Sequence, residues 1–223
     1  GLSSLHTLVL GPGNIQTTTG RAFSGLPILT TLTMNRNSIR TVGTWFGLIS
    51  KLVKLYLSWN DIEDIEEGAL QPLIDLRRLE LTHNRLHAVK QWYFKGLRSL
   101  KCLKLSYNNI SHIDEKSFNP LNSLTSVFLD HNKLVHLEVS WLKELPSGSL
   151  VHLEHNLMQA VNLSTHQEIE VMRGRYVYVK GNPFRCTCAL DSLKSKGARV
   201  LQDYKTLQCS YPSRLFGRKI AEV

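Results

Sequence analysis

The sequence contains few cysteines and prolines and no long hydrophobic run. Its 223 residues include four Cys and seven Pro. No stretch of about eighteen apolar residues is present, so we expect no segment that crosses a membrane. No basic start followed by an apolar run opens the chain, so we expect no signal peptide in it. The opening residues 1–5, GLSSL, already fit the middle of a repeating pattern, which predicts a piece of a longer protein.

Motifs of catalysis are also missing from the sequence. There is no HExxH, no GxSxG and no glycine-rich phosphate loop. The nine His residues are scattered and do not follow the spacing of metal ligands. Hydrophobic residues make up 42% and charged residues 20%, which is typical of a folded globular chain. We therefore predict a folded protein that is not an enzyme and needs no cofactor or metal.

Acidic residues are scarce at the C-terminal end. The chain carries a net charge of +9, but residues 173–223 hold 11 of its 27 Lys and Arg and only 3 of its 18 Asp and Glu. The first three quarters are thus nearly neutral. A nucleic-acid-binding protein with a uniformly basic surface would not show this division, so we expect no nucleic-acid partner.

A repeat of the form LxxLxLxxNxI determines the expected architecture. One copy consists of Leu76, Leu79, Leu81, Asn84 and Leu86. Similar copies begin at residues 5, 29, 52, 100 and 124, and two weaker copies begin at 148 and 174, so the period is 23–26 residues. The alternating apolar positions predict a short strand with one buried face, and stacked copies would form a parallel sheet. The Asn amide would pair with backbone groups where the chain turns.

The end of the chain adds a second motif. The sequence reads NPFRCTCAL at residues 182–190, followed by Cys209, YPS at 211–213 and Gly217. Together with the repeat, this motif resembles extracellular leucine-rich repeat proteins that have a cysteine-rich C-terminal cap, such as Toll-like receptor ectodomains and variable lymphocyte receptors. The resemblance implies an α/β solenoid, a leucine-rich repeat horseshoe with the parallel β-sheet on its concave face. We predict repeats over 1–181, about eight in number, and a truncated cap over 182–223.

The resemblance also implies the disulfide pattern of the cap. In that family the first cap cysteine pairs with the third and the second with the fourth, so Cys186 would pair with Cys209. The partner of Cys188 would then lie beyond the chain end, or the cap has three cysteines and Cys188 is free. A CxC pair suggests a metal site in other contexts, but three cysteines with no nearby His argue against zinc. Cys102 is expected on a strand, either as a reactive thiol or as a shielded free cysteine.

The concave strand face is the predicted binding site. Its solvent-facing positions carry aromatic and charged side chains, which are frequent anchors of interfaces. The candidate ligand-binding residues are Tyr56, Trp59, Arg78, Glu80, His83, Lys104, Tyr107, Phe128, Asp130, His131 and His152. The alternative is a solvated strand face with incidental aromatics. Neighbouring His131 and His155 also raise the hypothesis of a pH-sensitive surface.

The cap and two sequons provide further candidate sites. A basic cap patch would comprise Arg173, Arg175, Lys180, Arg185, Lys194, Lys196 and Arg199, and would bind an anionic polysaccharide or remain a solvated surface. Asn109 and Asn162 each begin an N-x-S glycosylation sequon. Disulfides and glycans indicate an extracellular protein, either secreted or on the cell surface.

The functional prediction is a non-catalytic recognition module of an immune-type receptor that binds a protein or glycan, including microbial ligands. Two alternatives stay open. One is an adhesion or matrix protein that binds a host protein or glycosaminoglycan, and the other is a structural dimerisation module. The fold alone does not choose among them, because binding sites are added to folds independently.

Overall fold

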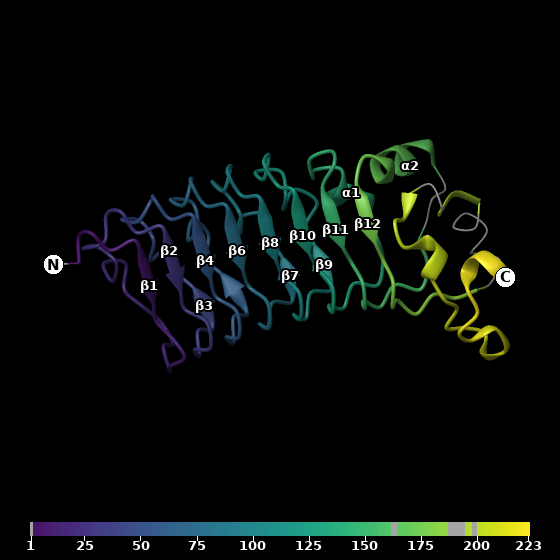
Figure 1. Ribbon diagram of the computed structural model, residues 1–223, viewed down its shortest axis with the longest axis horizontal. Helices are drawn as coiled ribbons and strands as arrows, with labels where there is room; N and C mark the ends of the chain where they lie inside the picture. The colour runs from purple at the N-terminus through teal and green to yellow at the C-terminus, as the bar shows by residue number, and fades with distance from the viewer. Residues whose placement is uncertain (1, 162–164, 187–194, 198–199) are drawn as a thin grey trace.

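The computed structural model describes residues 2–161, 165–186, 195–197 and 200–223. They form an elongated stack of repeats that runs from the N-terminus at the left of Figure 1 to the C-terminal cap at the right. One parallel sheet of eight strands runs along the whole stack. Its strands, in spatial order, are β1 (Thr7–Val9), β2 (Thr31–Thr33), β4 (Lys54–Tyr56), β6 (Arg78–Glu80), β8 (Cys102–Lys104), β10 (Ser126–Phe128), β11 (Leu150–His152) and β12 (Tyr176–Tyr178).

The opposite side of the stack consists mainly of turns and short strands. Strand β3 (Thr41–Val42) pairs with β5 (Asp64–Ile65), and β7 (Ala88–Val89) pairs with β9 (His112–Ile113). Two helices, α1 (Val139–Leu142) and α2 (His166–Arg173), replace such turns near the cap. Helix α2 begins at a capping box, in which Thr165 and Glu168 satisfy each other's backbone N–H groups. No helix in the described part of the chain is long and apolar enough to span a membrane.

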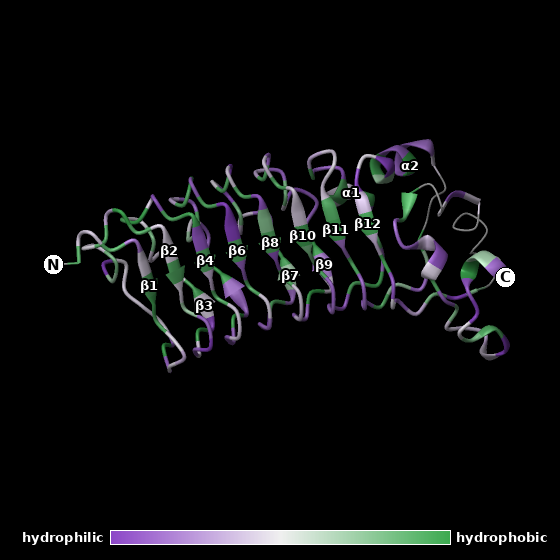
Figure 2. Ribbon diagram, viewed as in Figure 1, coloured by the Kyte–Doolittle hydropathy of each residue, from purple (hydrophilic) through white to green (hydrophobic). Residues whose placement is uncertain are grey.

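The register of the sheet follows the repeat period. The central residue of each strand aligns with the same residue of the next, as in Leu55, Leu79 and Leu103, and all three are fully buried. The flanking strand residues face outward, because successive side chains alternate between the two sides of a strand. In Figure 2 the ribbon changes between green hydrophobic and purple hydrophilic segments along the stack, and β6 is purple. The repeat therefore builds a single continuous core.

The Asn of each repeat forms a buried ladder, as the pattern predicts. In a central repeat, the side-chain oxygen of Asn84 accepts a hydrogen bond from the N–H of Ile62 at 3.0 Å. Its amide nitrogen donates to the carbonyls of Leu57 and Leu81, both at 3.0 Å. The same contacts recur at the equivalent Asn residues: Asn60, Asn108, Asn132 and Asn156. Each Asn thus joins its own turn to the preceding repeat.

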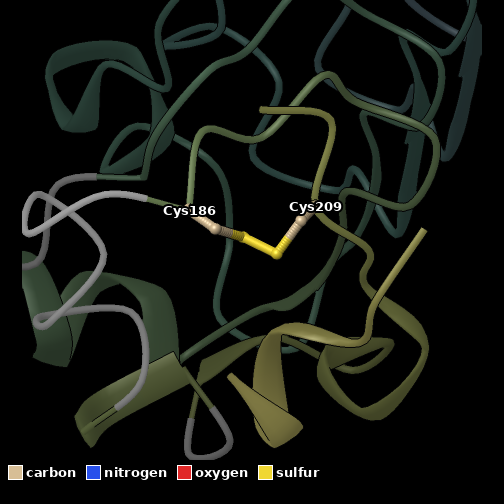
Figure 3. Close-up of a disulfide and its surroundings, with 2 residues drawn as sticks. All are labelled: Cys186 and Cys209. Atoms are coloured by element: carbon tan, nitrogen blue, oxygen red, sulfur yellow. A yellow bond between two sulfur atoms is a disulfide. The ribbon is translucent and has the colours of Figure 1, made fainter. Parts of the chain in front are cut away.

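The C-terminal cap closes the last strand of the sheet. Cys186 and Cys209 form a disulfide with a Cα–Cα distance of 5.6 Å, which confirms the pairing that the family resemblance implied (Figure 3). Asp203 accepts hydrogen bonds from the backbone N–H groups of Val179 at 2.8 Å and Lys180 at 2.6 Å. The cap further includes the short 3-10 helices η2 (Tyr204–Thr206), η3 (Ser213–Leu215) and η4 (Ile220–Glu222). The predicted solenoid with a disulfide-bonded C-terminal cap is confirmed.

Candidate functional site

A row of aromatic side chains borders the concave sheet, one residue before each ladder Asn. The five aromatic residues, and Arg36 at the equivalent position of an earlier repeat, have a positive φ of 53–59°, which residues other than glycine rarely adopt: Arg36, Trp59, His83, Tyr107, His131 and His155. The turn is the same in each repeat because the Asn ladder fixes the residue that follows. The left-handed turn therefore aligns one ring from each repeat at the same edge of the sheet.

The rings of this row are stacked on one another. The ring centroids of Trp59 and His83 are 3.7 Å apart, and those of His83 and Tyr107 are 4.4 Å apart. His131 follows at 4.1 Å and His155 at 4.5 Å from its predecessor. We call these five stacked side chains the ring column. Its members remain partly accessible at their edges, and Trp59 and Tyr107 are 52% and 43% exposed.

The environment of the ring column disfavours a charge on His83. Burial lowers the pKa of His83, and His131 on the far side of Tyr107 lowers it further, because two nearby imidazolium ions would repel each other. His83 is therefore held in the neutral form more strongly than a free imidazole.

A second row lies in the middle of the sheet. The rings of Phe128, His152 and Tyr178 stack at 4.6 and 4.9 Å, and the Lys104 ammonium lies 5.7 Å from the Phe128 ring centroid. Tyr56 occupies the same position on β4, but β6 and β8 separate it from Phe128. The two residues are therefore roughly 14 Å apart along the sheet, at three strand spacings.

Charged side chains fill the gap between these aromatic groups. Glu80 on β6 accepts a hydrogen bond from the guanidinium of Arg78 at 2.7 Å and forms an ion pair with Lys104 at 3.2 Å. The pKa of Arg78 is affected first by burial, which lowers it, but the contacts with Glu80 outweigh burial and raise it overall. One carboxylate thus holds two cations in place on neighbouring strands.

Carboxylates and imidazoles gather further along the same face. Asp130 lies 3.0 Å from the Nδ1 atom of His131 and accepts a hydrogen bond from the Ser106 hydroxyl at 2.5 Å. Glu154 lies 3.0 Å from Nδ1 of His152. Together with His155 and Lys180, these residues line a hollow of about 390 Å³. In the described part of the chain, no group of three or more His, Cys, Asp or Glu side chains could hold a metal ion.

The structure brings the predicted site residues together in three groups. Trp59, His83, Tyr107 and His131 belong to the ring column, Arg78, Glu80 and Lys104 form an ion-paired cluster, and Phe128 stacks on His152 near Asp130. Tyr56 joins none of the stacks. Cys102 is a free, half-buried cysteine on β8.

Four further cations of the concave face were not among the candidate ligand-binding residues predicted from the sequence. Lys54, Arg77 and Lys101 are exposed on or beside β4, β6 and β8. Arg36 lies over the Trp59 ring at 5.9 Å. Their repeat positions are visible in the sequence, but the neutralisation of neighbouring cations by Glu80 is not.

The sequence comparison decides the family. The model of the leucine-rich repeat family matches residues 3–62 and 74–134, more than half of the chain. The chain belongs to the leucine-rich repeat family. That family model describes a repeat scaffold and indicates no catalytic activity. No curated protein matches the sequence.

Several solved leucine-rich repeat structures resemble this chain. TLR13, solved in complex with ssRNA13, is 29% identical, with a TM-score of 0.66 over 76% of this chain and 24% of its own. Toll, solved with Spatzle and described in Drosophila development and innate immunity, is 21% identical, with a TM-score of 0.81 over 97% of this chain and 31% of its own. The leucine-rich repeats described here thus span about a quarter to a third of these two chains. Human 5T4, a trophoblast glycoprotein, is 20% identical, with a TM-score of 0.67 over 94% of this chain and 90% of its own.

The cations of the predicted basic cap patch differ in how far they are buried and in what they contact. Arg175 is half-buried, and its guanidinium donates to the carbonyls of Val171, Lys143 and Leu145. Burial lowers the pKa of Arg175, although Glu144 opposes this. Arg175 thus ties helix α2 and β12 to the preceding repeat.

Other members of the predicted basic cap patch are spread over the end of the molecule. Arg173 forms an ion pair with Glu170 at 2.7 Å, Lys180 lies at the hollow beside His155, and Arg185 stacks on Tyr211 at 5.6 Å. Lys196 is described and half-buried. Lys194, Arg199, Cys188 and Asn162 lie outside the described residues. The sequon residue Asn109 is half-buried beside the ladder.

A separate polar cluster lies on the turn side of the leucine-rich repeats, away from the sheet. The Asp64 carboxylate accepts hydrogen bonds from the Tyr93 hydroxyl at 2.6 Å and the Lys90 ammonium at 2.9 Å. Burial acts to raise the pKa of Asp64, but these two contacts outweigh it and lower the pKa. The same cluster raises the pKa of Tyr93, chiefly through burial. It links two repeats and faces no hollow of the concave sheet.

Proposed function

We propose that this chain is the recognition part of a secreted or cell-surface receptor, which binds a protein or glycan ligand through the concave face of its sheet. The observation that carries the proposal is the side-by-side arrangement of the ring column and the charged clusters on one rigid parallel sheet. A rigid sheet lowers the ordering cost of binding, and stacked aromatics with fixed charges suit an interface. Similarity to Toll-type structures supports an immune role with microbial ligands among the candidates.

An extracellular setting fits this proposal. The disulfide between Cys186 and Cys209 requires an oxidising compartment to persist. Glycans at Asn109 and Asn162 would form in the same compartment. If the chain is similar in function to variable lymphocyte receptors, its ligand is an antigen, and its specificity depends on the concave side chains while the scaffold stays the same.

The test is direct binding to intact bacteria, purified microbial glycans and heparin. Wild type is compared with the double variant Tyr107→Ala/Phe128→Ala, which removes one ring from each concave row. The matched control is Tyr211→Ala/Phe216→Ala, because these exposed cap residues are 55% and 74% accessible. Binding that is lost only in the concave variant supports the proposal. Binding that both variants retain contradicts it.

A second candidate function is adhesion to host glycosaminoglycans through the cap. The cap residues Arg185, Lys205, Arg214 and Arg218 are exposed, and no carboxylate pairs with them among the described residues. Replacement of Arg185, Arg214 and Arg218 by Glu should then lower the salt concentration that elutes the protein from heparin. Unchanged elution of this variant would remove the candidate.

A further inference from the structure

Positive charge is concentrated on one half of the concave face. Five cations lie on or directly before three neighbouring strands, β4, β6 and β8, and we call them the cationic patch: Lys54, Arg77, Arg78, Lys101 and Lys104. Lys54 and Arg78 are register neighbours, and the N–H of Lys101 donates to the carbonyl of Arg77 at 2.9 Å. The patch therefore covers only two strand spacings, roughly 10 Å.

Most of this charge is not neutralised within the chain. Glu80 is the carboxylate that pairs with Arg78 and Lys104. Lys54, Arg77 and Lys101 are exposed, and the described residues offer them no carboxylate partner. Arg77 also lines a hollow of about 520 Å³ at the start of these strands, where the carboxylate of Asp75 pairs with Lys51 at 3.5 Å. At least three cations are thus free to meet an anionic partner.

The other half of the face carries carboxylates. Asp130 follows β10 and Glu154 follows β11, only one and two strands beyond β8. Both point into the hollow that His131, His152 and Lys180 help to line. A ligand of uniform negative charge that extended along the sheet would meet these carboxylates within roughly 5–10 Å of the edge of the patch at β8. Like charges placed opposite each other disfavour such a ligand.

The ring faces of the ring column are already occupied. Stacking at 3.7–4.5 Å leaves no space between successive rings of the ring column. Arg36 lies over Trp59 at one end, and Gly181 lies against His155 at the other, where an added Cβ would come within 2.5 Å of the ring. Single-stranded nucleic acids bind through free aromatic faces on which their bases stack. This column instead presents edges, which suit hydrogen bonds with a protein surface.

We propose that the partner of the concave face is a protein with a local acidic cluster. The inference rests on the concave binding function proposed above. The acidic cluster docks on the cationic patch, and a basic group of the same partner faces Asp130 and Glu154. The division of charge over adjacent strands sets the orientation of the partner, since the reversed orientation would bring like charges together. The edges of Trp59 and Tyr107 form the border of this interface.

The experiment measures fluorescence anisotropy at low ionic strength with four labelled probes. They are a peptide with a Glu block followed by a Lys block, a peptide of Glu alone, a heparin oligosaccharide and an oligothymidylate. The protein is used as wild type, as the patch variant Lys54→Glu/Arg77→Glu/Lys101→Glu and as the cap variant Arg185→Glu/Arg214→Glu/Arg218→Glu. The two variants change the net charge equally, and circular dichroism checks that both remain folded.

Wild type should bind the two-block peptide most tightly, and the patch variant should weaken this binding about tenfold or more while the cap variant leaves it unchanged. Equal binding of that peptide by wild type and the patch variant would overturn the inference. Tighter binding of heparin or oligothymidylate that the patch variant abolishes would also overturn it, but would leave the concave face as the binding site. If no probe binds wild type, the acidic-cluster inference is wrong, while the concave function is still judged by the Tyr107→Ala/Phe128→Ala variant.

Discussion

A single side chain joins each repeat to the one before it. Asn84 forms three hydrogen bonds with backbone groups, and it is only 7% exposed. Asn84→Ala would leave one backbone N–H and two carbonyls without these partners in a buried turn. We expect a loss of about 3 kcal/mol in the free energy of unfolding, because each unsatisfied buried group costs about 1–3 kcal/mol. Urea denaturation measures it, and Asn14→Ala at the exposed N-terminal end is the control. A loss equal to that of the control would contradict the role of the ladder.

At the same scale, His83 makes stability depend on pH. Its pKa in the folded chain is lowered by burial and by His131, so the unfolded chain takes up its proton first as the pH falls. The stability that neutral His83 provides is complete above its unfolded pKa of 6.5 and is lost as the pH falls from there through the folded pKa. We expect His83→Phe, which keeps a ring in the stack, to show a smaller fall of the melting temperature between neutral and mildly acidic pH. His166→Phe replaces an exposed His on helix α2 and should retain the wild-type pH dependence. If the melting temperature of wild type and both variants falls equally with pH, this role of His83 is excluded.

Among the elements, β12 needs the cap because no further strand of the described chain pairs with its outer edge. Asp203 accepts the N–H groups of Val179 and Lys180 there, and Gln202 donates to the carbonyl of Val177 at 3.0 Å. We expect Asp203→Ala to lower the free energy of unfolding by about 1–3 kcal/mol, since two donors lose their acceptor. Asp203→Asn keeps one acceptor oxygen and should cost less. Thermal denaturation of both variants measures the two losses of stability. Equal losses would show that the hydrogen-bond acceptor at residue 203 does not stabilise β12.

The elements also show what the sequence can and cannot predict. The strands and the Asn ladder were predictable because their period of 23–26 residues forces the same side chain into the same place in each repeat. The role of Asp203 was not, because it lies outside the repeat and its contacts reach back 23 and 24 residues. The row of rings was predictable from spacing, but its closed stacking depends on the positive φ of the turn. The division of the concave face into a cationic and a carboxylate half could not be predicted, because it depends on the pairing of Glu80 with Arg78 and Lys104.

Over the whole molecule, burial changes from one end of the stack to the other. Leu8 on β1 is half-buried, whereas its register counterpart Leu79 on β6 is fully buried between repeats on both sides. In a solenoid, each repeat is stabilised by its own contacts and by its nearest neighbours. Repeats at the middle should therefore open less often than the first one.

Leu79→Ala should lower the free energy of unfolding by about 2–5 kcal/mol, because it leaves a cavity in a closed core. Leu8→Ala removes a side chain that is already partly in water, so we expect a loss of about 1 kcal/mol. Amide hydrogen exchange of wild type should show the same order, with fast exchange in β1 and slow exchange in β6 and β8. Equal losses for the two substitutions, or equal protection of β1 and β6, would mean that the stack unfolds as one cooperative unit. Stability would then not be a sum of neighbouring contacts, and the concave face would be rigid along its full length.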